Sequence, residues 1–249
     1  MHFHLPKPMH GWREFTGEIS IIVIGVLIAL GAEQVVEAIH RRTVVQETRD
    51  AIRQEFDLGL ATLVVRHSIE PCIDRRLDEL RTILGEWNRT GDFPTSKWVA
   101  QAPSEGIDLT RYDAAVSAGN MTLLPSSEQY QIGSIADALR NFDQIQGDER
   151  PLWGRLRALQ AGAKDLSEGD RSALRMALQD ASRLNYQAAL AGYQILELAR
   201  EYGFRPDLSE FNRTIRRTLK GSGYKPSICW PIDTPPGVAN RYQAVPLSL

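Results

Sequence analysis

An uncharged apolar segment near the N-terminus constrains the fold of this 249-residue chain more than any other feature. Residues 19–32 read ISIIVIGVLIALGA, and Glu18 and Glu33 bracket them. At about 1.5 Å per residue, these 14 residues would form roughly 21 Å of helix, whereas the hydrocarbon core of a bilayer is roughly 30 Å thick. The segment must therefore recruit flanking residues if it crosses a membrane.

A helix that includes the flanking residues is long enough to cross. The 25 residues from Phe15 to Ile39 suffice, and Trp12 and Phe15 supply aromatic side chains where an interfacial anchor is expected. The acidic side chains at the two ends of the apolar segment would then lie at or just inside the interfaces. We predict an N-terminal tail over residues 1–14 and a single transmembrane helix over residues 15–39, with the lipid bilayer as its partner.

Two other interpretations of the segment stay open. Apolar runs of roughly 10–14 residues also occur in buried core helices and in secretory signal peptides. Small residues at Ala29 and Gly31 suit a signal cleavage site. The region before the segment nevertheless balances Lys7 and Arg13 with two glutamates, whereas a signal peptide begins with a positively charged region.

The segment HGWREFTGEISIIVIGVLIALGAEQVVE, about a tenth of the chain, resembles the N-terminus of a group of uncharacterised bacterial membrane proteins. Those proteins carry a similar Gly-Glu-Ile…Ile-Gly-Val-Leu-Ile-Ala-Leu signature, followed by a helical domain. A weaker likeness is AAVSAGNMTLL at residues 114–124, similar to the family's turn of small residues, Gly, Asn and Leu before a long helix. The likeness does not extend past Gly203. It implies a single anchor and a helical domain, and it brings no activity, substrate or catalytic residue.

The composition is that of a globular protein. Hydrophobic residues make up 43% and charged residues 24%, which excludes disordered, collagen-like and multi-span membrane proteins. With 29 basic and 31 acidic side chains the net charge is −2, so we expect no nucleic-acid partner, because such proteins are normally basic. Two cysteines cannot build a disulfide framework, and five scattered histidines do not suit a structural zinc site.

Beyond residue 39 the apolar residues recur every three or four positions, the spacing of one helical face. We predict that the membrane helix continues as a stalk that ends near Pro71, followed by a second helix and a long loop over residues 90–110. A short helix at residues 111–118 should end at Gly119-Asn120. The inward positions of the stalk and the second helix would be Ile52, Phe56, Leu60, Leu63, Ile73, Leu77, Leu80, Leu84 and Trp87.

Two further helices complete the predicted bundle. One begins near Ser126 and should break or kink at Gly147 and Pro151. The other follows the sequence SEGD at residues 167–170, which has the Ser-x-x-acid form of a capping box. We predict an all-α fold, in which the transmembrane helix continues into an antiparallel helical bundle over residues 40–204. The inward positions of these two helices would be Ile132, Ile135, Leu139, Phe142, Ile145, Leu152, Leu156, Leu159, Leu174, Leu178, Ala181, Leu184, Ala188, Ala191, Ile195 and Leu198.

Residues 205–249 differ from the rest of the chain in charge and in proline content. They hold seven basic and three acidic side chains, a net +4, which leaves −6 for residues 1–204. We predict a short helix over about residues 208–219 and an extended, proline-rich tail after Gly221. This basic segment either packs on the acidic remainder of the chain or offers a surface to anionic lipid or to a partner.

The two cysteines lie in different parts of the chain. Cys72 follows Pro71, and Cys229 precedes Trp230 in the tail. In an oxidising compartment, a Cys72–Cys229 disulfide would hold the tail against the bundle, a contribution on the order of 4–5 kcal/mol in the chain-entropy model. The alternative is two unpaired thiols, one of them buried as a small apolar side chain.

Small and acidic residues in the predicted span are candidates for contacts between helices. Gly25 and Ala29 form a small-x-x-x-small pattern that Ala32 extends, and small residues let membrane helices approach closely. A homodimer seam is one interpretation, and the ordinary abundance of Gly and Ala in membrane helices is the other. Glu18 and Glu33 are 15 positions apart, about 60° around a helix, and either reach the headgroups or serve a function inside the membrane.

Two sequence features give opposite orientations for the span. Arg41, Arg42 and Arg49 follow it, which by the positive-inside rule favours a cytoplasmic C-terminal domain. A short N-terminal tail before a translocated domain is nevertheless a common arrangement, and a disulfide suits the periplasm. We expect a single-pass protein of the bacterial inner membrane with a periplasmic C-terminal domain.

The sequence contains no recognised catalytic or metal-binding motif. There is no Gly-x-Ser-x-Gly elbow and no His-Glu-x-x-His pair. His67 and Cys72 are five residues apart, but no acid that would orient the histidine is evident. His2, His4 and His10 have no fixed ligand spacing. We expect no catalytic, cofactor-binding or metal-binding residues.

These features favour an interaction, structural or sensory role for a membrane-anchored helical protein, with a homodimer or another membrane protein as its partner. The second hypothesis is a subunit of a larger inner-membrane assembly, in which Glu18 or Glu33 pairs with a polar group of another subunit. The third is an enzyme with an unfamiliar site, for instance in a cleft between Trp98, Tyr112 and the bundle.

Overall fold

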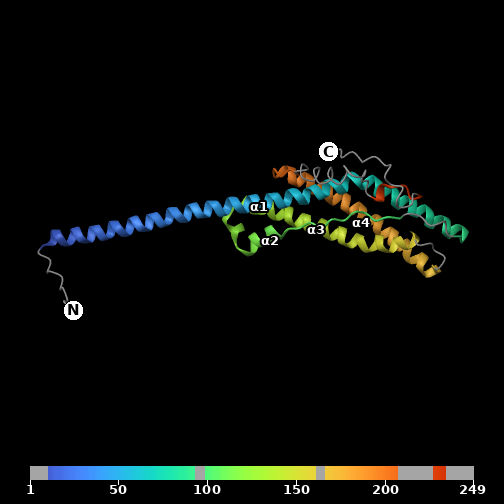
Figure 1. Cartoon of the computed structure of the whole chain (residues 1–249), viewed down its shortest axis with the longest axis horizontal. Coiled ribbons are helices and arrows are strands. Elements are labelled where there is room, and N and C mark those ends of the chain that lie inside the picture. The colour runs from blue at the N-terminus through green and yellow to red at the C-terminus, as the bar shows by residue number, and fades with distance from the viewer. Residues whose placement is uncertain (1–10, 93–98, 161–165, 207–226, 234–249) are drawn as a thin grey trace, which may run out of the picture.

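The computed structural model describes residues 11–92, 99–160, 166–206 and 227–233, and this part of the chain is helical with no strand. The predicted all-α fold class is confirmed. Helix α1 (Trp12–Thr90) has 79 residues, which is about 118 Å at 1.5 Å per residue. Its N-terminal half projects alone, and its C-terminal half lies along α3 (Ser126–Leu156) and α4 (Glu168–Glu201) (Figure 1). The shorter elements are α2 (Thr110–Ser117), η1 (Asn120–Leu123), η2 (Arg157–Gln160) and η4 (Ser227–Cys229).

The three long helices form the bundle, with α4 antiparallel to both α1 and α3. Two ion pairs join α1 to α3, Arg49–Glu128 and Arg66–Glu149. The residue number increases in both helices from the first pair to the second, so α1 and α3 are parallel. A long connection from Gly91 to Pro125 makes this possible, since it returns the chain to the start of α3. Within it, Leu109 is buried together with Val99, Ala100 and Ala102.

The expected end of the stalk near Pro71 is wrong, because α1 continues through Pro71 to Thr90. Proline lacks the N–H that would bond the carbonyl four residues earlier, which normally breaks a helix. Here Ile69 and Ile73, 3% and 0% exposed, lie in the same apolar cluster on either side of Pro71. Their packing holds both turns in one helix and outweighs the lost hydrogen bond.

Of the break or kink expected at Gly147 and Pro151, the break does not occur. Helix α3 runs through both residues to Leu156 and then tightens into the 3-10 turn η2. Leu152, Trp153 and Leu156 are 9%, 0% and 0% exposed, so the turns after Pro151 are as well packed as those before it. As at Pro71, burial of the turns that follow the proline keeps the helix continuous.

The short helix α2 and its turn agree with the sequence pattern. Gly119 follows α2 with a φ of 75°, a left-handed conformation that favours glycine. The start of α2 is stabilised from outside, because Glu55 of α1 accepts hydrogen bonds from the backbone N–H groups of Arg111 (2.7 Å) and Tyr112 (2.9 Å). Glu55 is 6% exposed and takes the place of a capping side chain, which Leu109 cannot supply.

The capping box at the start of α4 is confirmed. The Ser167 side chain accepts from the Asp170 backbone N–H, and the Asp170 carboxylate accepts from the Ser167 backbone N–H at 2.8 Å. The Asp170 carboxylate also accepts from the Ser167 hydroxyl at 2.6 Å, and this hydrogen bond, followed by the one from the Ser167 backbone N–H, holds the pKa of the Asp170 carboxyl below its usual value. The capping box satisfies backbone donors that the helix itself leaves unpaired, which fixes where α4 begins.

The predicted inward positions form the core. Of those in the described helices, all are buried except Ile145, Ala191 and Leu198, which are partly buried. Apart from a small cluster of Ala61 and Val64, the buried apolar residues divide into two large clusters along the bundle. One surrounds Phe56 and Phe142 near the projecting half of α1, and the other surrounds Trp87 and Trp153 at the far end.

The predicted helix over residues 208–219 lies outside the described residues, as does most of the tail. The described part of the tail, residues 227–233, begins with the 3-10 turn η4, whereas we expected an extended chain there. Ile228 and Ile232 are 0% and 9% exposed and pack in the far apolar cluster. This part of the tail turns because both side chains face the bundle.

Replacing Phe142 by alanine should lower the free energy of unfolding by about 3–5 kcal/mol. Phe142 is fully buried, and its Cε2 lies 3.5 Å from the point where a Cβ on Gly192 would be. Tyr130→Ala is the matched control on the same helix, because Tyr130 is 70% exposed, and it should change stability by less than about 0.5 kcal/mol. Urea unfolding of the detergent-solubilised chain, followed by circular dichroism, measures both. Equal losses would contradict this packing.

Candidate functional site

A disulfide joins the C-terminal half of α1 to the tail. The sulfur atoms of Cys72 and Cys229 are 2.10 Å apart and the Cα atoms 4.8 Å apart, across 157 positions of sequence. Cys229 is 1% exposed and Cys72 is partly buried. Since both cysteines are paired here, Cys72 offers no thiol that could act with His67, which instead lies 3.2 Å from Glu70.

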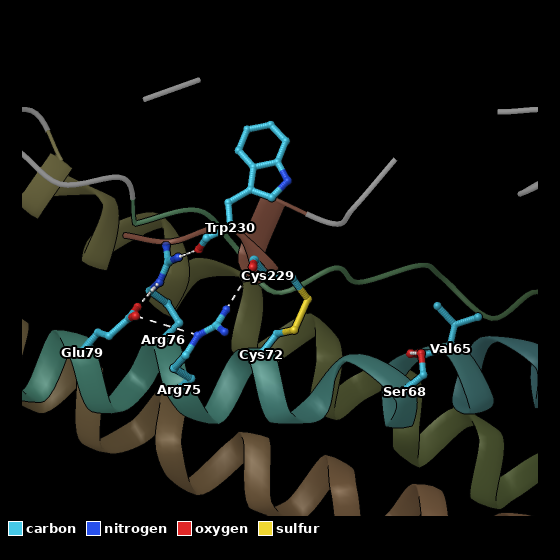
Figure 2. Close-up of a disulfide and its surroundings, with 8 residues drawn as sticks. All are labelled: Val65, Ser68, Cys72, Arg75, Arg76, Glu79, Cys229 and Trp230. Atoms are coloured by element: carbon cyan, nitrogen blue, oxygen red, sulfur yellow. Dashed lines mark hydrogen bonds and ion pairs between the residues drawn. A yellow bond between two sulfur atoms is a disulfide. The ribbon is translucent and has the colours of Figure 1, made fainter. Parts of the chain in front are cut away.

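Two consecutive arginines of α1 hold the backbone of the tail beside the disulfide (Figure 2). Arg75 Nη2 donates to the carbonyl oxygen of Cys229 at 3.0 Å, and Arg76 Nη2 donates to that of Trp230. Arg76 Nη1 also donates to the carbonyl oxygen of Val99 at 2.7 Å. A single guanidinium therefore joins α1, the connection after α1 and the tail.

Arg76 is a buried cation. Its side chain has no exposed surface, and its Nε lies 2.8 Å from Glu79 Oε2. Burial lowers the pKa of the Arg76 guanidinium, and the adjacent Glu79 opposes that effect. A buried charge is tolerated only while its hydrogen-bond partners stay in place. The Trp230 carbonyl of the tail is thus part of what keeps Arg76 charged inside the domain.

A second polar group crosses the middle of the bundle, with one residue from each long helix. Arg66 Nη2 of α1 donates to Glu149 Oε1 of α3 at 3.1 Å and to Asn185 Oδ1 of α4 at 2.7 Å. The exposed fractions of Arg66, Glu149 and Asn185 are 5%, 1% and 3%. In every helix these residues lie between the positions that build the two apolar clusters. We name Arg66, Glu149 and Asn185 the polar layer.

Neighbouring side chains extend the polar layer. Trp153 Nε1 donates to Glu149 Oε1 at 3.1 Å, and Asn185 Nδ2 donates to Asp74 Oδ1 at 2.7 Å. Burial, with the nearby Asp78 carboxylate, raises the pKa of Asp74. Glu149 Oε2 has no hydrogen-bond partner among the described residues. The layer fixes how the three helices align, because sliding any helix would separate these buried charges and dipoles from their partners.

Sequence reasoning missed these arginines and their partners, although a pattern points to them. Arg66 follows Leu63 by three positions and Arg76 follows Ile73 by three, so both stand on the apolar face of α1. Glu149 stands seven positions after Phe142 on α3. A charged residue at an inward position of an amphipathic helix indicates a buried ion pair when another helix offers the opposite charge.

The predicted anchor residues lie apart from both polar groups. Gly25, Ala29, Ala32, Glu18 and Glu33 are all exposed on the projecting half of α1. This helix contains an 18-residue window with a mean hydropathy of 2.3, none of it buried within the chain. By length and composition it is long and apolar enough to cross a membrane.

Several other candidates have a definite outcome. His2, His4, His10 and Trp98 lie outside the described residues. Tyr112 is partly buried on α2, where burial raises the pKa of its phenol and the Arg140 guanidinium lies 5.3 Å from its ring centre. The described ranges contain no group of three His, Cys, Asp or Glu side chains placed to hold a metal ion.

Comparisons of the chain with models of protein families, with curated proteins and with solved structures found no match. Three features of the molecule itself bear on its function. These are the disulfide that holds the tail, the polar layer inside the bundle and the exposed apolar half of α1.

The double variant Cys72→Ser/Cys229→Ser should lose up to about 5 kcal/mol of unfolding free energy, the chain-entropy value for a loop of 157 residues. Chemical denaturation of the variant and of the oxidised wild type measures the difference. The reduced wild type is the control and should match the variant. Equal stability of all three forms would show that the disulfide contributes nothing.

Arg66→Met should cost about 3–5 kcal/mol of unfolding free energy, because it leaves the Glu149 carboxylate buried without its cation. The double variant Arg66→Met/Glu149→Leu removes both charges and should recover most of this loss. A double-mutant cycle by urea unfolding, completed with Glu149→Leu, measures the coupling between the two side chains. Additive losses in the cycle would mean that the 3.1 Å ion pair does not stabilise the fold.

Proposed function

We propose that this protein is a single-pass protein of the bacterial inner membrane whose helical domain lies in the periplasm and binds another protein, in a structural or sensory role. One observation carries the proposal. From Phe15 to Thr43 every side chain of α1 is exposed, although the segment is strongly apolar. A soluble monomer rarely exposes so much contiguous apolar surface to water, and a bilayer removes that surface from water.

The ends of the apolar segment support a membrane span. The rings of Trp12 and Phe15 lie together, with their centres 5.9 Å apart, at the N-terminal end of the apolar segment, where a spanning helix would have its interfacial aromatic side chains. Glu18 and Glu33 then lie at or just inside the two interfaces. The likeness of this segment to the anchor of a group of uncharacterised bacterial membrane proteins supports the same arrangement.

The disulfide supports the periplasm as the location of the domain. Disulfides persist in oxidising compartments and are rare in the cytoplasm. Arg41 and Arg42 after the span favour the opposite orientation under the positive-inside rule. We weigh the buried Cys72–Cys229 pair more heavily, because the attachment of the tail and the environment of Arg76 both depend on it.

An exposed aromatic stripe on α4 supports a protein partner. Tyr186, Leu190 and Tyr193 stand at intervals of four and three residues on one helical face and are 68%, 45% and 60% exposed. Tyrosine is enriched in protein interfaces, since its ring buries area while its hydroxyl keeps a hydrogen bond. Because all three side chains are exposed, packing within this domain does not explain why large aromatic and aliphatic residues occupy these positions.

A second candidate is a subunit role in a larger inner-membrane assembly. Its supporting observation is that Glu18 and Glu33 are both exposed on a helix that contacts no other described element at those positions. No described residue elsewhere in the chain supplies a partner for these carboxylates, which another subunit would then supply. Solubilised protein that migrates only as a monomer or dimer would exclude this candidate.

Labelling with a membrane-impermeant maleimide in intact cells tests the orientation. Tyr186→Cys and His4→Cys, each made in the wild-type background, place one thiol on either side of the proposed span. We expect Tyr186→Cys to react in intact cells, His4→Cys to react only after lysis, and the native pair to react only after reduction. Reaction of Tyr186→Cys only after lysis would place the domain in the cytoplasm.

Membrane fractionation with and without residues 1–40 tests the anchor. The full chain should stay in the membrane pellet after alkaline carbonate extraction, and the shortened chain should be soluble and should unfold cooperatively. A full chain released by carbonate would overturn the proposed anchor. Aggregation of the shortened chain would contradict the division between anchor and domain.

A further inference from the structure

One face of α1 carries apolar residues from the proposed span into the segment beyond it. Alternating steps of three and four positions, starting at Ile22, are the seam spacing of a two-stranded coiled coil. Val36 and Ile39 are 67% and 59% exposed on this face. We name the whole set the seam face, and its members are Ile22, Gly25, Ala29, Ala32, Val36, Ile39, Thr43 and Gln46.

Lipid does not account for the outer part of the seam face. A hydrocarbon core of roughly 30 Å takes about 20 residues of helix, which from Phe15 ends near Gln34. Val36 and Ile39 come after that point, and charged or ionisable side chains surround them on the other faces of α1. These are Glu33, Glu37, His40, Arg41 and Arg42. Apolar side chains aligned at the seam positions of a segment outside the hydrocarbon core would be buried by a second helix, and not by lipid.

The bundle leaves the seam face free as far as Gln46. Val45 and Thr48 turn toward the bundle, whereas Thr43 and Gln46 are exposed. Seven residues after Gln46, at the next equivalent position, Arg53 lies 5.6 Å from the centre of the Phe204 ring. Arg53 itself is exposed, but Leu60, seven residues further along the same side of the helix, is fully buried. The domain therefore covers this side of α1 by Leu60, where any seam must have ended.

The charges beside the seam fit a parallel pair. Arg42 precedes the seam residue Thr43, and Glu47 follows the seam residue Gln46, so they occupy the g position of one heptad and the e position of the next. In a parallel coiled coil these two positions face each other across the pair. Arg42 and Glu47 are exposed, and neither forms an ion pair with another described residue.

We propose that a second copy of this chain packs on the seam face, in parallel and in register, with Arg42 of each copy paired with Glu47 of the other. The proposal rests on the membrane anchor proposed above, because two copies anchored in the same orientation are necessarily parallel. Within the bilayer Gly25, Ala29 and Ala32 let the helices approach closely. Outside it, Val36 and Ile39 bury apolar surface against their counterparts.

Oxidative cross-linking of single added cysteines in native membranes tests the contact. Helix axes 8–10 Å apart put seam positions about 4–6 Å apart between copies, within the range a disulfide accepts. We expect Ile39→Cys to give a disulfide-linked dimer on non-reducing gels and Arg41→Cys to give little. Arg41 is the matched control, since it lies two residues away on the opposite face and is equally exposed. Equal cross-linking at both positions would overturn the seam.

Charge reversal in the Ile39→Cys background tests the register. Arg42→Glu and Glu47→Arg should each reduce the cross-linked fraction several-fold, because each places like charges opposite one another. The combination Arg42→Glu/Glu47→Arg should restore it, and Arg41→Glu, with the same change in charge, should leave it unchanged. No restoration in the combination would contradict the proposed pairing.

Carbonate extraction of the same membranes separates the two proposals. A chain that stays in the pellet and cross-links equally at residues 39 and 41 keeps its anchor and loses the dimer. A chain that carbonate releases, yet cross-links only at residue 39, keeps the dimer and loses the anchor. A pelleted chain that cross-links at residue 39 alone supports both.

Discussion

The continuity of α1 as a single helix, through Pro71, is the constraint on which the rest of the molecule depends. One helix supplies both the exposed apolar segment and a full side of the bundle, so neither can turn or shift without the other. The packing of Ile69 and Ile73 carries the helix past Pro71, at the turn where the disulfide begins. A break at Pro71 would have placed Cys72 at a helix end with no fixed direction toward the tail.

Apolar packing alone does not determine how three amphipathic helices slide past one another, because dispersion and burial have little direction. The polar layer supplies that direction, since Arg66 reaches α3 and α4 at once with distances of 3.1 and 2.7 Å. Arg76 acts in the same way at the far end and ties α1 to two segments that have no regular structure to hold them. In both places a buried guanidinium donates hydrogen bonds to groups far away in sequence. A fold that separated these groups would leave a buried cation without its partners, which strongly destabilises it.

The sequence predicted what depends on local pattern. The helical class, the turn at Gly119, the capping box at Ser167 and nearly all inward positions follow from spacing and from capping chemistry. The errors came at Pro71 and Pro151, where a local rule predicts a break and packing against distant helices overrides it. The polar layer could not be placed from sequence in the same way, because the partner of Arg66 lies 83 residues away in one case and 119 in the other.

The exposed stripe of α4 and the polar layer share one turn of helix. Tyr186 points outward one position after Asn185, whose side chain binds both Arg66 and Asp74 inside the bundle. Arg66 in turn lies 20 positions, about 30 Å of unbroken helix, from Gln46 at the end of the proposed seam. A partner that shifted α4 at Tyr186 would therefore displace a ligand of Arg66, and α1 would carry any resulting rotation toward the proposed membrane span as a rigid body. If the proposed dimer forms, this arrangement gives a physical route between a binding event on the domain and the proposed contact between two copies, with the polar layer as its midpoint.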